Sequence, residues 1–156
     1  MVKFYEISQI EKLGIGDGTV KAAANGTKNY SFGTVVSGVA SAPATTGLGL
    51  KLFANYEKGD DAYTETTTPG GELITAWDMA AQAGKSIQVS PESITYAPSE
   101  NYASITEGTT LMAAGSDGNL AIISASSGIS TGGVYFKVTK KINFGGAGVL
   151  AEVVVK

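Results

Sequence analysis

Several residue types on which enzymes depend are missing from this chain. Its 156 residues include no cysteine and no histidine, and all 11 basic side chains are lysines, so arginine is absent too. Without cysteine or histidine the chain has no thiol nucleophile, no histidine general base, no Ser-His-Asp triad and no zinc site of the usual kind. A disulfide framework is also excluded, so burial or association must stabilise the fold. We therefore expect a protein that is not an enzyme and that uses no cofactor and no metal.

Charge is scarce as well. Only 16% of the residues are charged, and the formal net charge is −3. Without arginine there is no bidentate contact to phosphate or guanine, and a negative chain offers no basic field, so nucleic acid is not an expected partner. No stretch approaches the about 20 apolar residues that span a bilayer, so no membrane is expected either. The N-terminal residues lack the apolar run of a secretory signal, which, with the absence of cysteine, favours assembly in a reducing cytoplasm.

What the chain does contain is strand and turn residues. Hydrophobic residues make up 43% of it and there are 21 glycines, which is typical of one folded domain with many turns. The clearest element is a β-hairpin, in which the apolar runs 111–112 and 120–123 flank the turn 116–119, Ser-Asp-Gly-Asn. Apolar alternation and β-branched residues predict further strands over residues 30–40, 48–56, 72–77, 86–90, 134–142 and 148–155.

Only one segment has the pattern of a helix, residues 78–84, with Asp78 as N-cap and Gly84 as the stop. The polar stretch 57–71 is predicted to be a loop. Residues 1–33 form either an extended arm or edge strands joined by glycine turns, and residues 34–156 form a β-rich domain. The whole pattern predicts a mostly β protein, a small β-barrel or sandwich with one short helix and an N-terminal segment able to extend from it.

Two motifs suggest a ligand but are incomplete. Gly84-Lys85-Ser86 resembles part of a phosphate loop, yet the glycine that the motif needs five residues earlier is Met79, and the segment follows a predicted helix where it should precede one. The acidic residues at 57–61 and Glu65 have the oxygen ligands that calcium prefers. Their spacing matches no EF-hand, so a solvated loop is the default interpretation.

Trp77 supplies the alternatives from other functional classes. It lies between Glu72 and Asp78, and carboxylates beside an aromatic ring are used by glycosidases and by sugar-binding modules. A carbohydrate-binding module would use Trp77 and tyrosines as a stacking platform, and an enzyme that uses only carboxylates is the least favoured hypothesis. Against both, Asp78 is already explained as an N-cap, and a single tryptophan in a β domain is usually part of the core.

The C-terminal half resembles the head decoration proteins of tailed bacteriophages, which are also called capsid cement proteins. The residues that carry the resemblance lie at 70–90, 105–112, 117–121, 134–138 and 149–154. They are similar to the family's succession of a Gly-led strand, an Asp-Gly hairpin and a closing pair of strands. The resemblance is to lambda-like members of the family, covers about half of the chain and implies a β-tulip-like fold.

The resemblance also implies a role, that of a structural protein on the outside of the virion that clamps neighbouring subunits of the major capsid protein. Lambda-like members are commonly trimers, so it implies binding to further copies of the chain itself. The N-terminal segment would contact the capsid, which makes its apolar and aromatic side chains partner-binding candidates: Phe4, Tyr5, Ile7, Ile10, Tyr30 and Phe32. The extra length before Tyr30 and the loop 57–71 depart from the compact lambda-like pattern. A tail tube subunit or a head fibre is the alternative among phage structural proteins.

Overall fold

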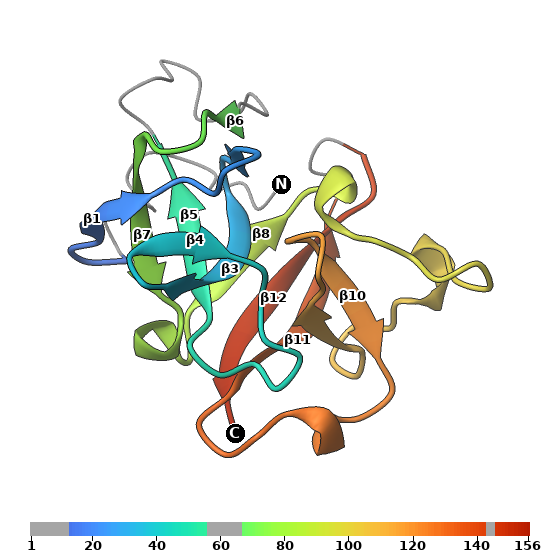
Figure 1. Ribbon diagram of the computed structural model, residues 1–156. Coiled ribbons are helices and arrows are strands. Elements are labelled where there is room, and N and C mark those ends of the chain that lie inside the picture. Colours follow the sequence, from blue (N-terminus) through green and yellow to red (C-terminus); the bar gives the residue numbers. More distant parts are fainter. Residues whose placement is uncertain (1–12, 56–66, 143–145) are drawn as a thin grey trace.

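The computed structural model describes residues 13–55, 67–142 and 146–156, and most of its strands are labelled in Figure 1. One group of strands closes a small barrel; in chain order they are β1 (Asp17–Lys21), β3 (Ser31–Val36), β4 (Val39–Ser41), β5 (Lys51–Ala54) and β7 (Leu73–Asp78). A second group forms an open sheet: β8 (Ser86–Val89), β9 (Leu111–Ala114), β10 (Leu120–Ile123), β11 (Val134–Ile142) and β12 (Gly148–Val155). The protein is therefore mostly β and contains a small barrel, as its sequence predicts.

The barrel has the strand order β1-β4-β3-β5-β7, and β1 also pairs with β7 to close it. All neighbours are antiparallel except β1 and β4, which pair in parallel through Lys21 and Val39 alone. A short ribbon of β2 (Thr27–Lys28) and β6 (Thr67–Thr68) lies beside the barrel in Figure 1. The barrel depends on contacts between residues that are distant in the sequence.

Strand β5 connects two cores because it is buried on both faces. Phe53 points into the barrel, where it packs with the small cluster of Val20, Ala40, Ile74 and Ala76. Its neighbour Leu52 points the other way, into the larger cluster that includes the second sheet. Side chains alternate between the two faces of a strand, so the outer side of this barrel wall forms part of the main core. Gly33 leaves room for this arrangement, since a Cβ atom there would lie 2.4 Å from the Phe53 ring.

The second sheet has the order β10-β9-β11-β12-β8 and packs against that barrel wall. Phe136 on β11 meets Phe32 on β3 with ring centroids 5.1 Å apart. The inward residues of β11 and β12 are completely buried at Phe136, Val138, Val149 and Ala151. In Figure 1 the barrel lies on the left and strands β10 to β12 on the right, with β8 between them. The predicted hairpin of β9 with β10 and the predicted closing pair of β11 with β12 are both confirmed.

Two local predictions were wrong. The segment 30–40 is not one strand but a hairpin, because Ser37 and Gly38 both take positive φ angles (51° and 77°) and form the tight turn between β3 and β4. The predicted helix at 78–84 is a single 3₁₀ turn, η1 (Ala80–Gln82), in which an Asp78 oxygen accepts from the Ala80 N–H at 3.2 Å. Three further 3₁₀ turns were not predicted: η2 (Pro91–Ser93), η3 (Tyr102–Ser104) and η4 (Ser126–Gly128).

The described part of the N-terminal segment is not an arm. Strand β1 is one of the barrel strands, and β3 crosses the predicted boundary between residues 33 and 34. The alternative interpretation, strands joined by glycine turns, fits residues 17–33. Residues 1–12 lie outside the described part, as do residues 57–66 of the predicted loop, while Thr67 and Thr68 of that loop form β6.

Candidate interaction surface

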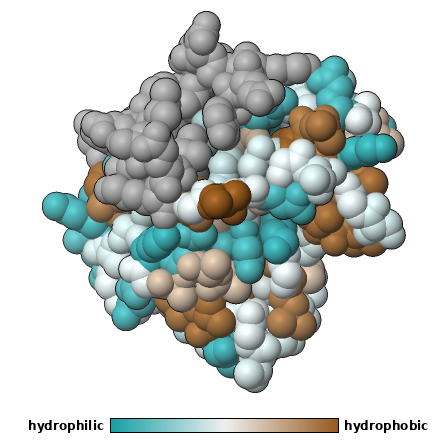
Figure 2. Space-filling model, turned by 90° about the vertical axis from the view of Figure 1, so that its left-hand side faces the viewer, coloured by the Kyte–Doolittle hydropathy of each residue, from teal (hydrophilic) through white to brown (hydrophobic). Residues whose placement is uncertain are grey.

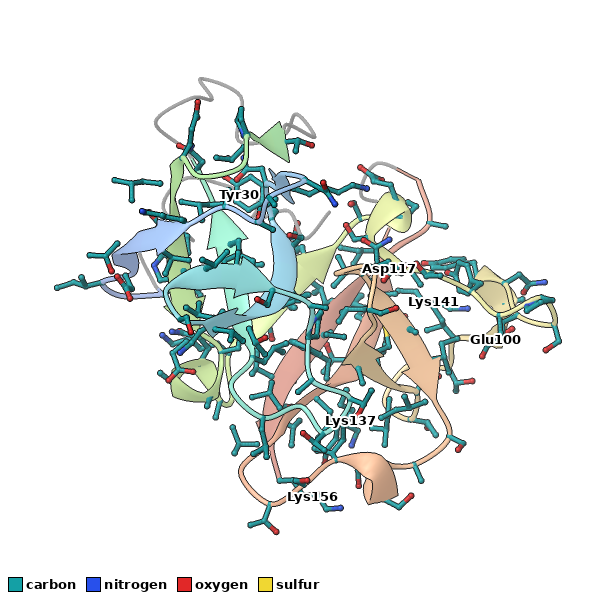
Figure 3. All side chains as sticks on the ribbon, in the orientation of Figure 1. Tyr30, Glu100, Asp117, Lys137, Lys141 and Lys156 are labelled. Atoms are coloured by element: carbon teal, nitrogen blue, oxygen red, sulfur yellow. The ribbon has the colours of Figure 1, made fainter. Side chains whose placement is uncertain are left out.

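Two of the predicted partner-binding residues lie in the interior. Tyr30 is 1% exposed and Phe32 is 2% exposed, and the Tyr30 N–H donates to the Phe53 carbonyl at 2.7 Å. Figure 3 labels Tyr30 among the barrel elements. A side chain enclosed by its own chain offers no area to a partner, so the prediction was wrong for these two. Phe4, Tyr5, Ile7 and Ile10 lie outside the described residues, and for them it stays a prediction.

Trp77 does not form a stacking platform. It is 3% exposed and belongs to the main core, and its indole N–H donates to the Gly14 carbonyl at 3.1 Å. The contact anchors the chain before β1 to the barrel wall. Trp77 therefore offers no exposed ring to a sugar, and the interpretation of Trp77 as a core residue is confirmed.

The described acidic side chains are dispersed. No group of three or more of them is placed to hold a metal ion within residues 13–55, 67–142 and 146–156, and the predicted acidic loop at 57–65 lies outside these ranges. Hydrogen bonds from the Thr19 hydroxyl and N–H, at 2.6 and 2.9 Å, lower the pKa of Asp17. Asp78 lies 3.6 Å from the Lys51 ammonium. These carboxylates have the contacts of ordinary surface groups.

One groove lies between the barrel and the turn that joins β9 to β10. It has a volume of about 230 Å³ and is lined by small residues together with Lys28, Phe32, Phe53 and Asp117. Both Asp117 oxygens already accept hydrogen bonds, one from the Thr95 hydroxyl and one from the Asn119 N–H. Pockets for drug-sized ligands measure about 300–1,000 Å³. The groove has room for one side chain of a partner and is too small for a ligand of that size.

An exposed aliphatic row crosses the barrel on the wall that faces away from the second sheet. We call it the barrel row; its members follow from the register of four strands and are Leu73, Lys21, Val39 and Val36. Leu73 is 59% exposed and Val36 is 58% exposed. The Lys21 side chain has no hydrogen bond or ion pair with any residue that the structure describes. The row thus presents aliphatic groups around an unpaired cation.

A second row lies on the outward face of β12. We call it the β12 row; it consists of Leu150, Glu152 and Val154, all partly exposed, which alternate with the buried Ala151 and Val153. Lys137 on β11 is directly opposite Glu152 in the register, but no ion pair joins them in the described structure. In Figure 3 Lys137 and Lys141 are labelled on the second sheet, and Lys156 is labelled just past the end of β12. The outward face of this sheet is therefore partly apolar, with charges of both signs.

The sequence contains a signal for the barrel row that was missed. Val35-Val36 and Leu73-Ile74 are adjacent apolar pairs within strands, and adjacent side chains point to opposite faces. When only one face is buried, one member of each pair must be exposed. Figure 2, a view of the barrel side, shows such apolar residues in brown, separated by polar ones and not merged into one continuous patch.

Comparison with known proteins gives no relative, because no family model, no curated protein and no solved structure matches the chain. None of the helices within residues 13–55, 67–142 and 146–156 has the length and apolar character to cross a membrane.

Proposed function

We propose that this protein is a structural component of a phage virion, which binds the outside of the capsid and stabilises it by holding neighbouring subunits of the major capsid protein together. The protein is assembled in the host cytoplasm and acts as a homo-oligomer on the capsid exterior. It transforms no substrate. The resemblance of its C-terminal half to capsid decoration proteins suggests this role, and the physical character of the chain supports it.

The observation that carries the proposal is the barrel row. Leu73 and Val36 are both more than half exposed, and with Val39 they lie in one row across paired strands, where a flat partner surface can cover them together. Because the row is built from four paired strands, its side chains hold a fixed spacing and lose little freedom on binding. A rigid β body with an apolar contact row fits a protein whose work is adhesion.

Symmetry reduces the affinity that each contact must supply. A capsid presents the same site many times, and an oligomer that engages several sites at once gains through effective concentration. A modest affinity of each single contact is then sufficient for stable decoration. Binding through many weak contacts does not require histidine, cysteine or arginine, which are common in catalytic sites and in strong polar contacts and which this chain lacks.

The test is binding to heads that were assembled without this protein. Purified chain is added over a range of concentrations, the heads are pelleted, and the bound protein is counted per head. We expect saturable binding at a fixed copy number, and weaker binding of a Phe4→Ser, Ile7→Ser double variant, because the sequence predicts that these residues contact the capsid. A Thr139→Ala variant, changed at an exposed position of β11, is the matched control. Absence of binding at micromolar protein would remove the proposal.

A further inference from the structure

Strand β10 is the edge of the second sheet that lies away from the barrel (Figure 1). The barrel is closed and has no edge strand, and the other edge of the second sheet, β8, lies between the barrel and β12 with Ile87 and Val89 buried. The outer side of an edge strand presents N–H and C=O groups with which another strand can pair. Of the two five-stranded sheets, β10 thus provides the edge that a strand from outside can reach.

The hydrogen bonds of the hairpin show which backbone groups of β10 point outward. The Gly115 N–H donates to the Asn119 carbonyl at 2.8 Å, and in an antiparallel pair every second residue makes such bonds. Ala121 and Ile123 therefore bond to β9, whereas the N–H and C=O of Ile122 point away from it. On that outer side the Ile122 backbone has no hydrogen bond with any residue of 13–55, 67–142 and 146–156.

The chain itself starts another strand along this edge and then leaves it. The Thr95 N–H donates to the Leu120 carbonyl at 2.8 Å, within a parallel bridge between this segment and β10. In parallel pairing the next N–H in line is that of Ala97, but it donates to the Glu100 carboxylate at 2.8 Å. The edge is therefore occupied at Leu120 and open at Ile122.

The open edge lacks the features that usually keep other strands away. Natural edge strands are protected by charged side chains, by proline or by a bulge. Residues 118–136 contain no charged side chain and no proline, and the register between β9 and β10 runs without a bulge. On the inner side of the sheet Ile122 and Tyr96 are only partly buried, at the margin of the main core. A strand that adds here would cover both side chains and pair with the free backbone groups.

We propose that an extended segment of the major capsid protein adds to this edge as a strand and pairs with the N–H and C=O of Ile122; this inference rests on the proposed function. In such strand addition the main-chain hydrogen bonds supply affinity and alternate side chains supply specificity. The segment is uncharged, because β10 offers no opposite charge, and it places an apolar side chain against Ile122 and Tyr96. A second copy is a poorer occupant, since its own open edge is confined between the Thr95 contact and η4.

Hydrogen–deuterium exchange of the wild-type protein, read at single amides by fragmentation in the mass spectrometer, tests this inference. In the free protein the Ile122 N–H should exchange at least about tenfold faster than those of Ala121 and Ile123, which bond to β9. In protein bound to heads that were assembled without it, exchange at Ile122 should slow at least about tenfold. The Ala121 and Ile123 amides are the internal references.

Ile122→Pro removes the outward N–H and no bond to β9, and proline is tolerated on an edge strand when its nitrogen faces solvent. It should weaken binding to heads at least about tenfold, because the added strand loses a main-chain hydrogen bond and its fit. Ile122→Val shortens the same side chain but keeps the N–H, so this matched control should bind within about threefold of the wild type. Thermal unfolding of both variants shows that the fold is retained.

The possible outcomes separate this inference from the proposed function. Absence of wild-type binding to heads would remove both. Binding that leaves the Ile122 amide as fast as in the free protein would overturn the inference alone, as would normal binding of a folded Ile122→Pro variant. Slow exchange at Ile122 in dilute free protein would contradict the open edge. Slowing that appears in concentrated protein without heads would assign the edge to a second copy instead. If Ile122→Pro does not fold, exchange in the wild type decides.

Discussion

Leu52 is the side chain that contributes most clearly to the packing of the barrel against the second sheet. It is fully buried, it points out of the barrel into the main core, and it lies between Phe32 and Trp77 in the register of β3, β5 and β7. The change Leu52→Ala removes the aliphatic group at this contact. Two large rings on either side have little freedom to move into the space, so we expect a cavity to remain.

Cavities of this kind have a known cost. Leu→Ala changes at buried sites lower the free energy of unfolding by about 2.7–5.0 kcal/mol, through lost burial and the cavity that remains. We expect about 3 kcal/mol at Leu52, out of a total stability of about 5–15 kcal/mol for a domain. For a chain of this size that loss lowers Tm by roughly 6–12 °C. Leu73→Ala is the matched control, because the same atoms are removed from a side chain that is 59% exposed, and its effect should stay within about 0.5 kcal/mol.

Urea unfolding measures the effect with two probes. Fluorescence of Trp77, the single tryptophan, reports the contact between barrel and sheet, and far-UV circular dichroism reports the strands of both. The two curves should coincide in the wild type and in both variants, because the shared core makes the molecule one cooperative unit. If Leu52→Ala cost less than about 1 kcal/mol, or if Leu73→Ala cost as much, the assignment of Leu52 to a shared core would be wrong.

Three further expectations concern single contacts. Gly33→Ala should destabilise the fold by more than about 2 kcal/mol, since its Cβ would lie 2.3 Å from the Ser41 carbonyl oxygen, whereas Gly18→Ala enters open space and should be neutral in the same urea assay. Gln82→Ala should lower unfolding free energy by about 1–3 kcal/mol, because it leaves a backbone carbonyl before β1 without the 2.8 Å bond from its amide; a Tm equal to that of the wild type would contradict this. Burial raises the pKa of Tyr102 above its usual 10.0. The folded state then holds this proton more tightly than the unfolded state, so stability should fall as pH rises through the raised pKa. The Tm of the Tyr102→Phe variant should fall less than that of the wild type between about pH 9 and 11, because the variant has no phenol to deprotonate.

The second sheet was largely predictable because its information is local. The turn at 116–119 contains the residues that tolerate tight turns, and the alternation of Val134, Phe136 and Val138 marks the buried face. Both signals lie within a few residues of the strands that they specify. The predicted hairpin and the predicted closing pair consequently agree with the observed strands to within two residues.

The barrel was predictable as a class but not in its arrangement. Its closure joins β1 to β7 and, through one parallel contact between Lys21 and Val39, to β4. No local pattern specifies which of these strands are neighbours. The sequence does not predict the turn at Ser37-Gly38, because serine at a positive φ angle is uncommon. It predicts wrongly that Tyr30 and Phe32 bind a partner, because the sequence alone does not show whether an aromatic residue in a strand faces the core or the solvent. The contact rows depend on that same register between distant strands.

The temperature at which phage heads release their DNA tests the proposed role as a stabilising protein. Heads assembled without this protein are heated with and without a saturating amount of it, and release is followed with a dye that binds free DNA. If the protein holds neighbouring capsid subunits together, its addition should raise the release temperature until every site on the head is filled. An unchanged release temperature in heads that carry the bound protein would contradict the account.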